Sequence, residues 1–222
     1  MNFQETFFFL SQLSRGFNHI GAVMPTSREA ARAMAAEALR QKKPKAILEV
    51  GPGTGPITTE LVRHLKADDR LVLCEVDDTF VAYLRKRFET EPELQRVRHQ
   101  VEILHQSVAD IPGEAQFDYI ISAVPLTRLP AEVAEAIFDS FRRLLKPGGT
   151  FTFLEYKFLR SLRKFTKTEE NADFIKVDKM MKDFINRYQF RSDSVMLNVP
   201  PANVRSLRFS EPAAEAAADV QP

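Results

Sequence analysis

Several glycines and a carboxylate near residue 50 lie at the end of an apolar segment, spaced as in a loop that could bind a ligand. The run ILEVGPGTG at residues 47–55 predicts a buried strand, a glycine turn and a helix that begins near Ile57. Glycine permits positive φ and lets a ligand approach the backbone closely. Pro56 follows Gly55, so the third glycine of a dinucleotide-binding G-x-G-x-x-G is missing, and the Gly-Lys-Ser/Thr of a phosphate-binding loop is absent too.

Two carboxylates flank this turn. Glu49 lies two residues before Gly51, where it would repel a pyrophosphate but suits a cation. Glu75 closes the next apolar segment, 24 residues after Gly51. A carboxylate there can accept hydrogen bonds from both hydroxyls of a ribose. NAD sites use the same arrangement, so Glu75 alone does not separate one nucleotide cofactor from another.

The elements that must position these residues alternate between strand and helix. Short apolar runs predict strands at 46–50, 71–75, 101–105, 119–122 and 150–156, with helical patterns between most of them. This order is typical of an α/β, doubly wound, Rossmann-like sheet that is mostly parallel and covered on both faces. Two more strands, at 192–199 and 204–209, are expected to form an antiparallel edge pair. The expected sheet is therefore seven-stranded with an antiparallel C-terminal strand.

Two helices are predicted before the first strand. Apolar side chains repeat at helical spacing over residues 2–17, which indicates an amphipathic helix, and an Ala-rich helix runs to about Lys42. Thr26 and Glu29 have capping-box spacing, and Asp78 is expected to cap the helix after the second strand. We therefore divide the chain into N-terminal helices (1–42), an α/β domain (43–210) with a basic insertion (157–190), and a flexible tail (211–222).

Composition excludes several classes of protein. The 222 residues contain one cysteine, Cys74, and four scattered histidines, which excludes an internal disulfide framework and a multi-thiolate zinc site, so no metal is expected. The net charge of +1 gives no global attraction to nucleic acid. No apolar run reaches the roughly 18–20 residues of a spanning helix, and the N-terminus lacks the basic opening of a signal peptide. A cytoplasmic protein is expected.

The pattern Glu49-x-Gly51-x-Gly53-x-Gly55 after a strand resembles the first motif of class I S-adenosylmethionine-dependent methyltransferases. The resemblance covers about residues 20–156 and includes a Leu-Lys-Pro-Gly-Gly turn before the fifth strand. It implies S-adenosylmethionine as the cofactor and a methyltransferase domain at 43–210. The cofactor-binding residues that it implies are Glu49, Gly51, Gly53, Thr54, Gly55, Glu75, Val76, Ser107, Val108 and Ser122.

The same resemblance assigns parts of the cofactor to parts of the chain. In that family the glycine loop contacts the methionine part, and the acidic residue before it helps to hold the amino group. The carboxylate after the second strand binds the ribose. Ser107 stands where the family often has an Asp that bonds the adenine amino group, and Asp110 is the alternative for that contact.

The segment after the fourth predicted strand bears on the methyl acceptor. Adenine-N6 methyltransferases carry Asn/Asp-Pro-Pro-Tyr there, whereas this chain has Ser-Ala-Val-Pro-Leu at 122–126. That segment offers no aromatic platform and few hydrogen-bond acceptors, so we expect an apolar pocket. Cys74 lies in the middle of a strand, so no cysteine is placed for carbon methylation.

Three stretches narrow the resemblance further: GAVMPTSREAARAMA from residue 21, SAVPLTRLP from residue 122 and NVPPANVRSLRF from residue 198. They resemble bacterial phospholipid N-methyltransferases and the related ornithine-lipid N-methyltransferases. The chain departs from that pattern at Thr26, Ala123 and Val124 and in its basic insertion. The resemblance implies N-methylation of the amine head group of a membrane lipid: phosphatidylethanolamine, its methylated forms, or ornithine lipid. The substrate-binding residues that we predict are Pro25, Thr26, Ser27 and Pro125.

An amine with a pKa of about 10, like that of lysine, must lose its proton before it can accept a methyl group. The sequence shows no histidine-based dyad for this step. Tyr156, at the end of the fifth predicted strand, is the first candidate to orient the amine, and Glu155 is the second. Alternation along a strand can turn Glu155 to the other face, and Tyr156 can equally be a core residue.

Two stretches suggest an anionic membrane surface as a partner, with the protein peripherally associated with the inner face of the cell membrane. The Phe-rich helix at 2–17 could lie in the acyl boundary. Residues 157–165 mix aromatic and cationic side chains, and each Lys or Arg near anionic lipid is worth about 1 kcal/mol. In the alternative interpretation, the helix is a lid on the protein's own core and the insertion is a solvated connector.

Other functions stay open at this point. The basic stretch at residues 157–165 could bind the backbone of RNA. That would suit an rRNA or DNA adenine N-methyltransferase, although nucleic acid is not the expected partner. A non-catalytic protein that binds the cofactor is a further alternative. The sequence gives no indication of an oligomeric state.

Overall fold

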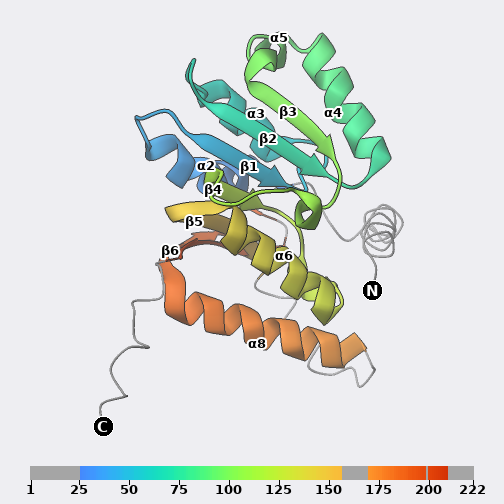
Figure 1. Ribbon diagram of the computed structural model, residues 1–222, viewed down its shortest axis with the longest axis vertical. Helices are drawn as coiled ribbons and strands as arrows, with labels where there is room; N and C mark the ends of the chain where they lie inside the picture. The colour runs from blue at the N-terminus through green and yellow to red at the C-terminus, as the bar shows by residue number, and fades with distance from the viewer. Residues whose placement is uncertain (1–25, 157–169, 199, 210–222) are drawn as a thin grey trace.

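The computed structural model describes residues 26–156, 170–198 and 200–209, which form one seven-stranded sheet with helices on both faces (Figure 1). The strands lie in the order β3-β2-β1-β4-β5-β7-β6. They are β1 (Ala46–Val50), β2 (Arg70–Glu75), β3 (Val101–His105), β4 (Phe117–Ser122), β5 (Leu145–Tyr156), β6 (Gln189–Val195) and β7 (Ala202–Arg208).

The pairing of the strands confirms the predicted doubly wound sheet. β1 pairs in parallel with β2 on one side and with β4 on the other. The order of the strands along the chain therefore reverses between β1 and β4. β7 runs antiparallel to both β5 and β6. In such sheets the carboxyl ends of the parallel strands on either side of the reversal form the ligand-binding edge. Here that edge lies beyond Val50 and Ser122, which pair directly.

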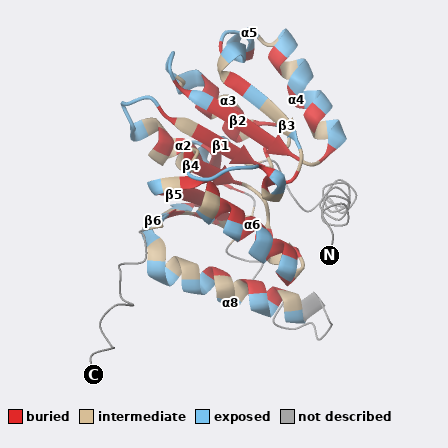
Figure 2. Ribbon diagram, in the orientation of Figure 1, coloured by how far each residue is buried: buried red, intermediate tan, exposed pale blue. Residues whose placement is uncertain are grey.

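The helices divide between the two faces of the sheet. One face carries α2 (Arg28–Arg40), α3 (Pro56–His64), α4 (Asp78–Thr90) and α5 (Pro92–Gln95), and the other carries α6 (Ala131–Leu144) and α8 (Glu170–Tyr188). Three short 3-10 turns complete the order: η1 (Arg98–Gln100), η2 (Val108–Asp110) and η3 (Leu126–Arg128). Figure 2 shows the central strands buried on both faces, whereas the helices are buried only on their inner sides.

The face under α6 and α8 is rich in phenylalanine. Phe138 on α6 stacks on Phe184 of α8 with ring centroids 4.8 Å apart. Phe141 lies 4.6 Å from Phe151 of β5, and Phe151 in turn stacks on Phe153. Aromatic pairs at these distances contribute about 0.5–1.5 kcal/mol beyond their buried area. This cluster therefore holds α6 and α8 against β5.

The two predicted helix caps were each wrong by one residue. Ser27, not Thr26, caps α2, because its hydroxyl accepts a hydrogen bond from the backbone N of Ala30 at 3.2 Å. Asp77, not Asp78, caps α4, because its carboxylate accepts from the backbone N atoms of Thr79 and Phe80. Each capping residue has an extended backbone, which lets its side chain reach back to the first turn.

Several predicted boundaries also move. α2 ends at Arg40 because Gln41 is already extended. β4 begins at Phe117, and β5 extends back to Leu145 through the glycine turn at 148–149. β6 and β7 lie at 189–195 and 202–208, so each begins before the predicted strand. Strands β1 and β3 have the predicted bounds.

Some predictions fall on residues that the structure does not describe. They are the Phe-rich helix at 2–17, Pro25, residues 157–169 of the basic insertion and the tail at 211–222. None of the helices in the described part of the chain is both long enough and apolar enough to cross a membrane.

Candidate functional site

Three glycines with positive φ form the turn that follows β1. Their φ angles are 69° at Gly51, 57° at Gly53 and 80° at Gly55. The backbone N of Gly51 donates to the carbonyl of Cys74 at the end of β2, and that of Gly55 donates to the carbonyl of Pro52, both at 2.9 Å. Other residues rarely adopt these angles, so the glycines fix the path of the loop across the carboxyl edge.

The space around the three glycines differs, and this separates packing from ligand binding. A Cβ atom at Gly51 would lie 2.7 Å from Cγ2 of Val124, and one at Gly55 would lie 2.7 Å from Nη1 of Arg87. A Cβ atom at Gly53 would meet nothing within 4 Å. Gly51 and Gly55 therefore allow close packing of the protein on itself, whereas Gly53 faces open space that a ligand can enter.

Glu75 ties the glycine loop to the end of β2. One carboxylate oxygen accepts from the backbone N of Gly53 at 3.1 Å. The other accepts from Val76 at 2.8 Å and from Asp77 at 3.1 Å. Burial raises the pKa of Glu75, while these three backbone bonds oppose the rise. A carboxylate offers about four acceptor positions, so one position is left for a ligand hydroxyl.

Glu49 lies beneath the loop with an unused acceptor. Its side chain is 1% exposed, and one oxygen accepts from the hydroxyl of Thr58 at 2.7 Å. The other oxygen is buried and has no hydrogen-bond partner in the described part of the chain. Burial raises the pKa of Glu49 to about 8. An unpaired buried acceptor is costly, and a cationic group of a ligand would satisfy it.

Arg87 of α4 was not foreseen from the sequence. Its Nη1 donates to the carbonyl of Thr54 at 2.8 Å, and its Nη2 donates to the hydroxyl of Thr59 at 3.1 Å. Two bonds to Glu91, at 2.7 and 2.8 Å, fix the guanidinium. Arg87 thus joins the helix after β2 to the loop after β1. An Arg and a Glu four residues apart on a helix commonly pair, but that spacing does not predict the contact with the loop.

The residues predicted to bind adenine lie in the turn after β3. The hydroxyl of Ser107 accepts from the backbone N of Ala109 at 3.2 Å and so caps η2. Val108 is buried in the core. Their contact with adenine remains a prediction. Ser122 at the end of β4 is also buried, and its hydroxyl accepts from the backbone N of Val124 at 3.3 Å.

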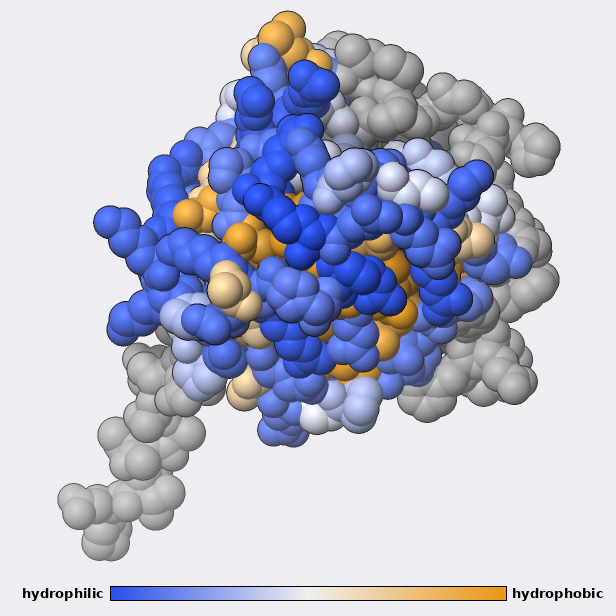
Figure 3. Space-filling view, turned by 90° about the horizontal axis from the view of Figure 1, so that it is seen from above, coloured by the Kyte–Doolittle hydropathy of each residue, from blue (hydrophilic) through white to orange (hydrophobic). Residues whose placement is uncertain are grey.

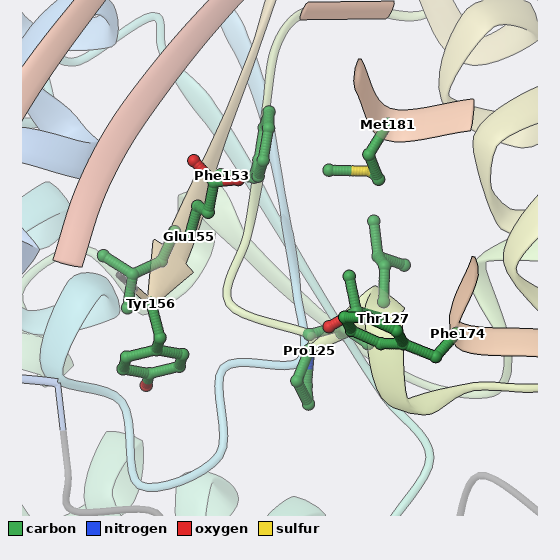
Figure 4. A pocket seen from close by; sticks show the side chains of 10 residues that line it. Pro125, Thr127, Phe153, Glu155, Tyr156, Phe174 and Met181 are labelled. Carbon is green, nitrogen blue, oxygen red and sulfur yellow. The ribbon is translucent and has the colours of Figure 1, made fainter. Parts of the chain in front are cut away.

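An apolar pocket adjoins the glycine loop on the side of β5, as the sequence predicted. Figure 4 shows Tyr156 and Phe174 on opposite sides of it, with Pro125 and Thr127 between them. Val124 belongs both to this pocket and to the packing against Gly51. The lining residues are Val124, Pro125, Leu126, Thr127, Phe153, Leu154, Glu155, Tyr156, Phe174 and Met181.

Tyr156 and Glu155 are neighbours on β5 and belong to opposite faces of the sheet. Tyr156 packs against the cluster on the α2 face. Glu155 forms an ion pair with Arg205 of β7. Burial raises the pKa of Tyr156, although the charge of Arg128 lowers it somewhat. The phenol is therefore protonated near neutral pH and can exchange hydrogen bonds without carrying charge.

The structure brings together two motifs that lie far apart in the sequence. The backbone N of Ser27 donates to Oδ1 of Asn198 at 3.0 Å, across 171 residues. Nδ2 of Asn198 donates to the carbonyl of Pro200 at 2.9 Å, and the side chain is 1% exposed. Thr26 is half-buried beside this contact. The start of α2 and the β6–β7 turn therefore meet at the edge of the sheet where β5 ends.

Comparisons of sequence extend these observations. Residues 47–149 match the family described as "Methyltransferase domain". The chain is 27% identical over 165 residues to an ornithine lipid N-methyltransferase from Singulisphaera acidiphila, which covers 73% of this chain and 85% of that protein. It is 31% identical over 96 residues to ribosomal RNA small subunit methyltransferase A from Mycoplasma mycoides, which covers 40% of this chain and 32% of that protein.

Solved structures share the fold at low sequence identity. A 1,6-didemethyltoxoflavin-N1-methyltransferase from Burkholderia thailandensis, solved with S-adenosylhomocysteine, has a TM-score of 0.65 and 16% identity over 95% of this chain and 92% of its own. The O-methyltransferase TomG from Streptomyces achromogenes has a TM-score of 0.61 and 19% identity over 93% and 90%. These enzymes methylate different atoms on one fold, so the fold alone does not select an acceptor.

Proposed function

The chain is a class I S-adenosylmethionine-dependent methyltransferase, and we propose that its methyl acceptor is the amine head group of a membrane lipid. One observation carries this proposal: the apolar pocket and the glycine loop meet at Val124. An acceptor in the pocket would lie beside a cofactor on the loop. The pocket contains one phenol, one carboxylate and the hydroxyl of Thr127 among apolar side chains, a lining that suits an alkylamine better than a nucleobase.

The cofactor fits the residues of the loop. The unpaired oxygen of Glu49 suits the ammonium group of the methionine part, and the open space at Gly53 leaves room for that part to pass. Glu75 keeps one acceptor position for a ribose hydroxyl. We assign adenine to Ser107 and Val108, and the remaining contacts to Gly51, Thr54, Gly55, Val76 and Ser122. When bound, S-adenosylmethionine supplies an electrophilic methyl group.

The lining of the pocket favours a neutral amine. Removing an ammonium group from water disfavours its charged form, so the apolar side chains lower the cost of losing the proton. We assign to the protonated Tyr156 hydroxyl the role of accepting a hydrogen bond from the amine and so directing its lone pair. Glu155 is the second candidate to orient the amine. It also lines the pocket and forms an ion pair with Arg205. Pro25, Thr26, Ser27 and Pro125 remain the proposed contacts to the head group.

The sequence comparison supports a lipid acceptor over the other candidates. The relation to the ornithine lipid N-methyltransferase spans 85% of that protein, whereas the relation to the rRNA methyltransferase spans 32% of it. The first match thus extends over most of both chains. We further propose that the protein acts while peripherally bound to an anionic membrane on its cytoplasmic face, with residues 2–17 and 157–167 contributing to the contact.

Transfer of a labelled methyl group tests the proposal. The full chain is incubated with labelled S-adenosylmethionine and vesicles that contain phosphatidylethanolamine, a methylated form of it, or ornithine lipid, and the lipids are separated by thin-layer chromatography. We expect label in at least one amine lipid and none in phosphatidylglycerol. Label in ribosomal RNA but in no lipid would contradict the proposal and favour the nucleic-acid alternative.

A further inference from the structure

Phe153 of β5 joins the acceptor pocket to the row of residues that ends at the glycine loop. It lines the pocket and pairs with Ser122 of β4, and Ser122 pairs in turn with Val50 of β1. Gly51, the next residue, begins the loop. Neighbouring strands lie about 4.8 Å apart, so Phe153 is rooted two strands, or roughly 10 Å, from the start of the loop. The register therefore places its ring beside the proposed meeting point of cofactor and acceptor.

One face of the Phe153 ring is covered by a second ring. Phe151 stacks on it with the centroids 5.2 Å apart and the planes 14° from parallel. Phe151 comes two residues earlier on β5, so the uncovered face of Phe153 points toward the carboxyl end of the strand. Phe153 is 3% exposed, and Met181 of α8 lies across the pocket from it (Figure 4). The uncovered face is therefore shielded from water and turned toward the ligand-binding edge.

The nitrogen that enters this pocket changes its charge during the reaction. As its lone pair forms the new N–C bond, the electron pair of the methyl C–S bond leaves with the sulfur, and the positive charge passes from sulfur to nitrogen. The apolar lining that favours a neutral amine opposes this charge. The carboxylate of Glu155 is shared with Arg205. Arg128, whose charge lowers the pKa of Tyr156, lies beside the lining rather than in it. A further group that stabilises a cation would therefore favour the transfer.

Aromatic rings already meet cations elsewhere on this chain. The guanidinium of Arg208 lies 4.5 Å from the ring centroid of Phe190, and that of Arg87 lies 5.9 Å from the ring centroid of Tyr83. Both rings are exposed, and Figure 3 shows the end of the molecule that carries α4 and α5 as a mainly hydrophilic surface. Such exposed contacts favour binding about twofold to fivefold, whereas desolvated ones reach about 30-fold. The buried ring of Phe153 offers a contact of the second kind.

We propose that Phe153 is a catalytic residue whose uncovered ring face holds the methylated nitrogen of the acceptor. The face of an aromatic ring carries negative charge density and attracts a cation. It attracts a neutral amine far less, so the ring stabilises the charge as it develops rather than the bound substrate. The proposal rests on the proposed function, because an amine acceptor becomes a cation when it is methylated. Tyr156 then orients the neutral amine, and Phe153 acts on the charge that the amine acquires.

Binding of a cation and of its uncharged copy tests Phe153 without turnover. Choline carries a trimethylammonium group, and 3,3-dimethylbutanol has the same shape with carbon in place of nitrogen. Each is titrated by nuclear magnetic resonance into the protein saturated with S-adenosylhomocysteine. The parent should bind choline about fivefold or more tightly than the carbon isostere. Phe153→Leu keeps an apolar side chain but lacks the ring. It should lower this ratio about fivefold by weakening choline alone.

Phe151→Leu is the matched control. It removes the ring stacked behind Phe153, and Phe151 is not among the residues that line the pocket. The control should keep the ratio of the parent, and both variants should bind S-adenosylhomocysteine like the parent, which shows that they fold. A parent that binds the two probes equally overturns the proposal. So does a Phe153→Leu variant that keeps the ratio, because the carboxylate of Glu155 rather than the ring would then hold the cation.

Methyl transfer to a lipid amine keeps this outcome distinct from that of the proposed function. Phe153→Leu should lower kcat about fivefold or more and leave KM within about twofold, because the ring acts on a charge that the substrate lacks. A kcat equal to that of the parent overturns the catalytic role. If the parent methylates no lipid amine, yet its preference for choline depends on Phe153, the lipid acceptor is wrong and the cation site stands. If the parent methylates lipid and Phe153→Leu keeps the preference, the cation site is wrong and the acceptor stands.

Discussion

The two sides of the carboxyl edge are held together by different interactions. On the cofactor side, charged and polar groups fix the backbone: Glu75 accepts from three N–H groups, and Arg87 donates to the carbonyl of Thr54. On the acceptor side, Val124, Phe153 and Phe174 enclose a pocket with few polar groups. Directional bonds suit the parts of a cofactor that take no part in the reaction, whereas an apolar enclosure selects by excluding water. Changes on the cofactor side should therefore reduce binding, and changes on the acceptor side should reduce turnover.

The largest effect is expected at Gly53. Gly53→Val should lower the affinity for S-adenosylhomocysteine by about 100-fold or more, or about 2.8 kcal/mol, because the side chain would occupy the open space above the loop. Isothermal calorimetry measures this affinity. Gly148→Val is the matched control, since Gly148 also has positive φ and open space around it. Gly148 lies near the amino end of β5, away from the carboxyl edge. The control should share the loss of thermal stability and keep the affinity.

Glu49 gives the cofactor side a pH dependence. Its pKa of about 8 in the free protein means that the carboxyl is protonated below that pH, whereas a bound ammonium group favours the carboxylate. The affinity for S-adenosylhomocysteine should therefore rise about tenfold from pH 6.5 to pH 8. Glu49→Gln should remove this rise. A parent affinity that stays flat over this range would mean that Glu49 does not meet the ammonium group.

The same group affects stability with the opposite sign. The pKa of Glu49 in the folded chain lies above the ordinary value of 4.5, so the folded chain binds more protons than the unfolded chain between about pH 4.5 and pH 8. The contribution of Glu49 to the stability of the free protein therefore falls as pH rises through this window. Added ligand should offset that fall.

Arg87 tests whether the polar bonds of the loop act on binding. Arg87→Met should weaken the affinity for S-adenosylhomocysteine by about fivefold to tenfold, roughly the value of one hydrogen bond. It should weaken 5′-methylthioadenosine less, because that molecule lacks the part assigned to the loop. Arg85→Met, an exposed change on the same helix, should alter neither affinity. Equal losses for both ligands would assign Arg87 a purely structural role.

The smallest effect is expected at Tyr156. Tyr156→Phe should lower kcat for a lipid amine about threefold to tenfold, the usual range for one neutral hydrogen bond, and leave the affinity for S-adenosylhomocysteine unchanged. Tyr119→Phe, on β4 against the same face of the sheet, is the control and should change neither quantity. A loss of cofactor affinity in Tyr156→Phe would break the division between the two sides of the edge.

Local patterns in the sequence predicted the cofactor side better than the acceptor side. The strand at 46–50 and the glycine turn follow from residues next to one another, and the structure has them as predicted. The caps of α2 and α4 were one residue off, since two adjacent polar residues competed for each position. Arg87 and Asn198 could not be predicted, because their partners lie 33 and 171 residues away. The ion pair that occupies Glu155 likewise depends on a strand 50 residues later.

The hydrogen bond between Ser27 and Asn198 also has a consequence for the order in which the protein is made. The loop after β1, the end of β2 and the turn after β3 are all complete within the first 110 residues. The edge of the sheet where β5 ends is closed only when residue 198 meets residue 27, and pairing of segments so far apart in the sequence is intrinsically slow. Chains emerge from the ribosome N-terminus first. A growing chain therefore contains every proposed contact to adenine and ribose long before it can assemble the edge that meets the acceptor.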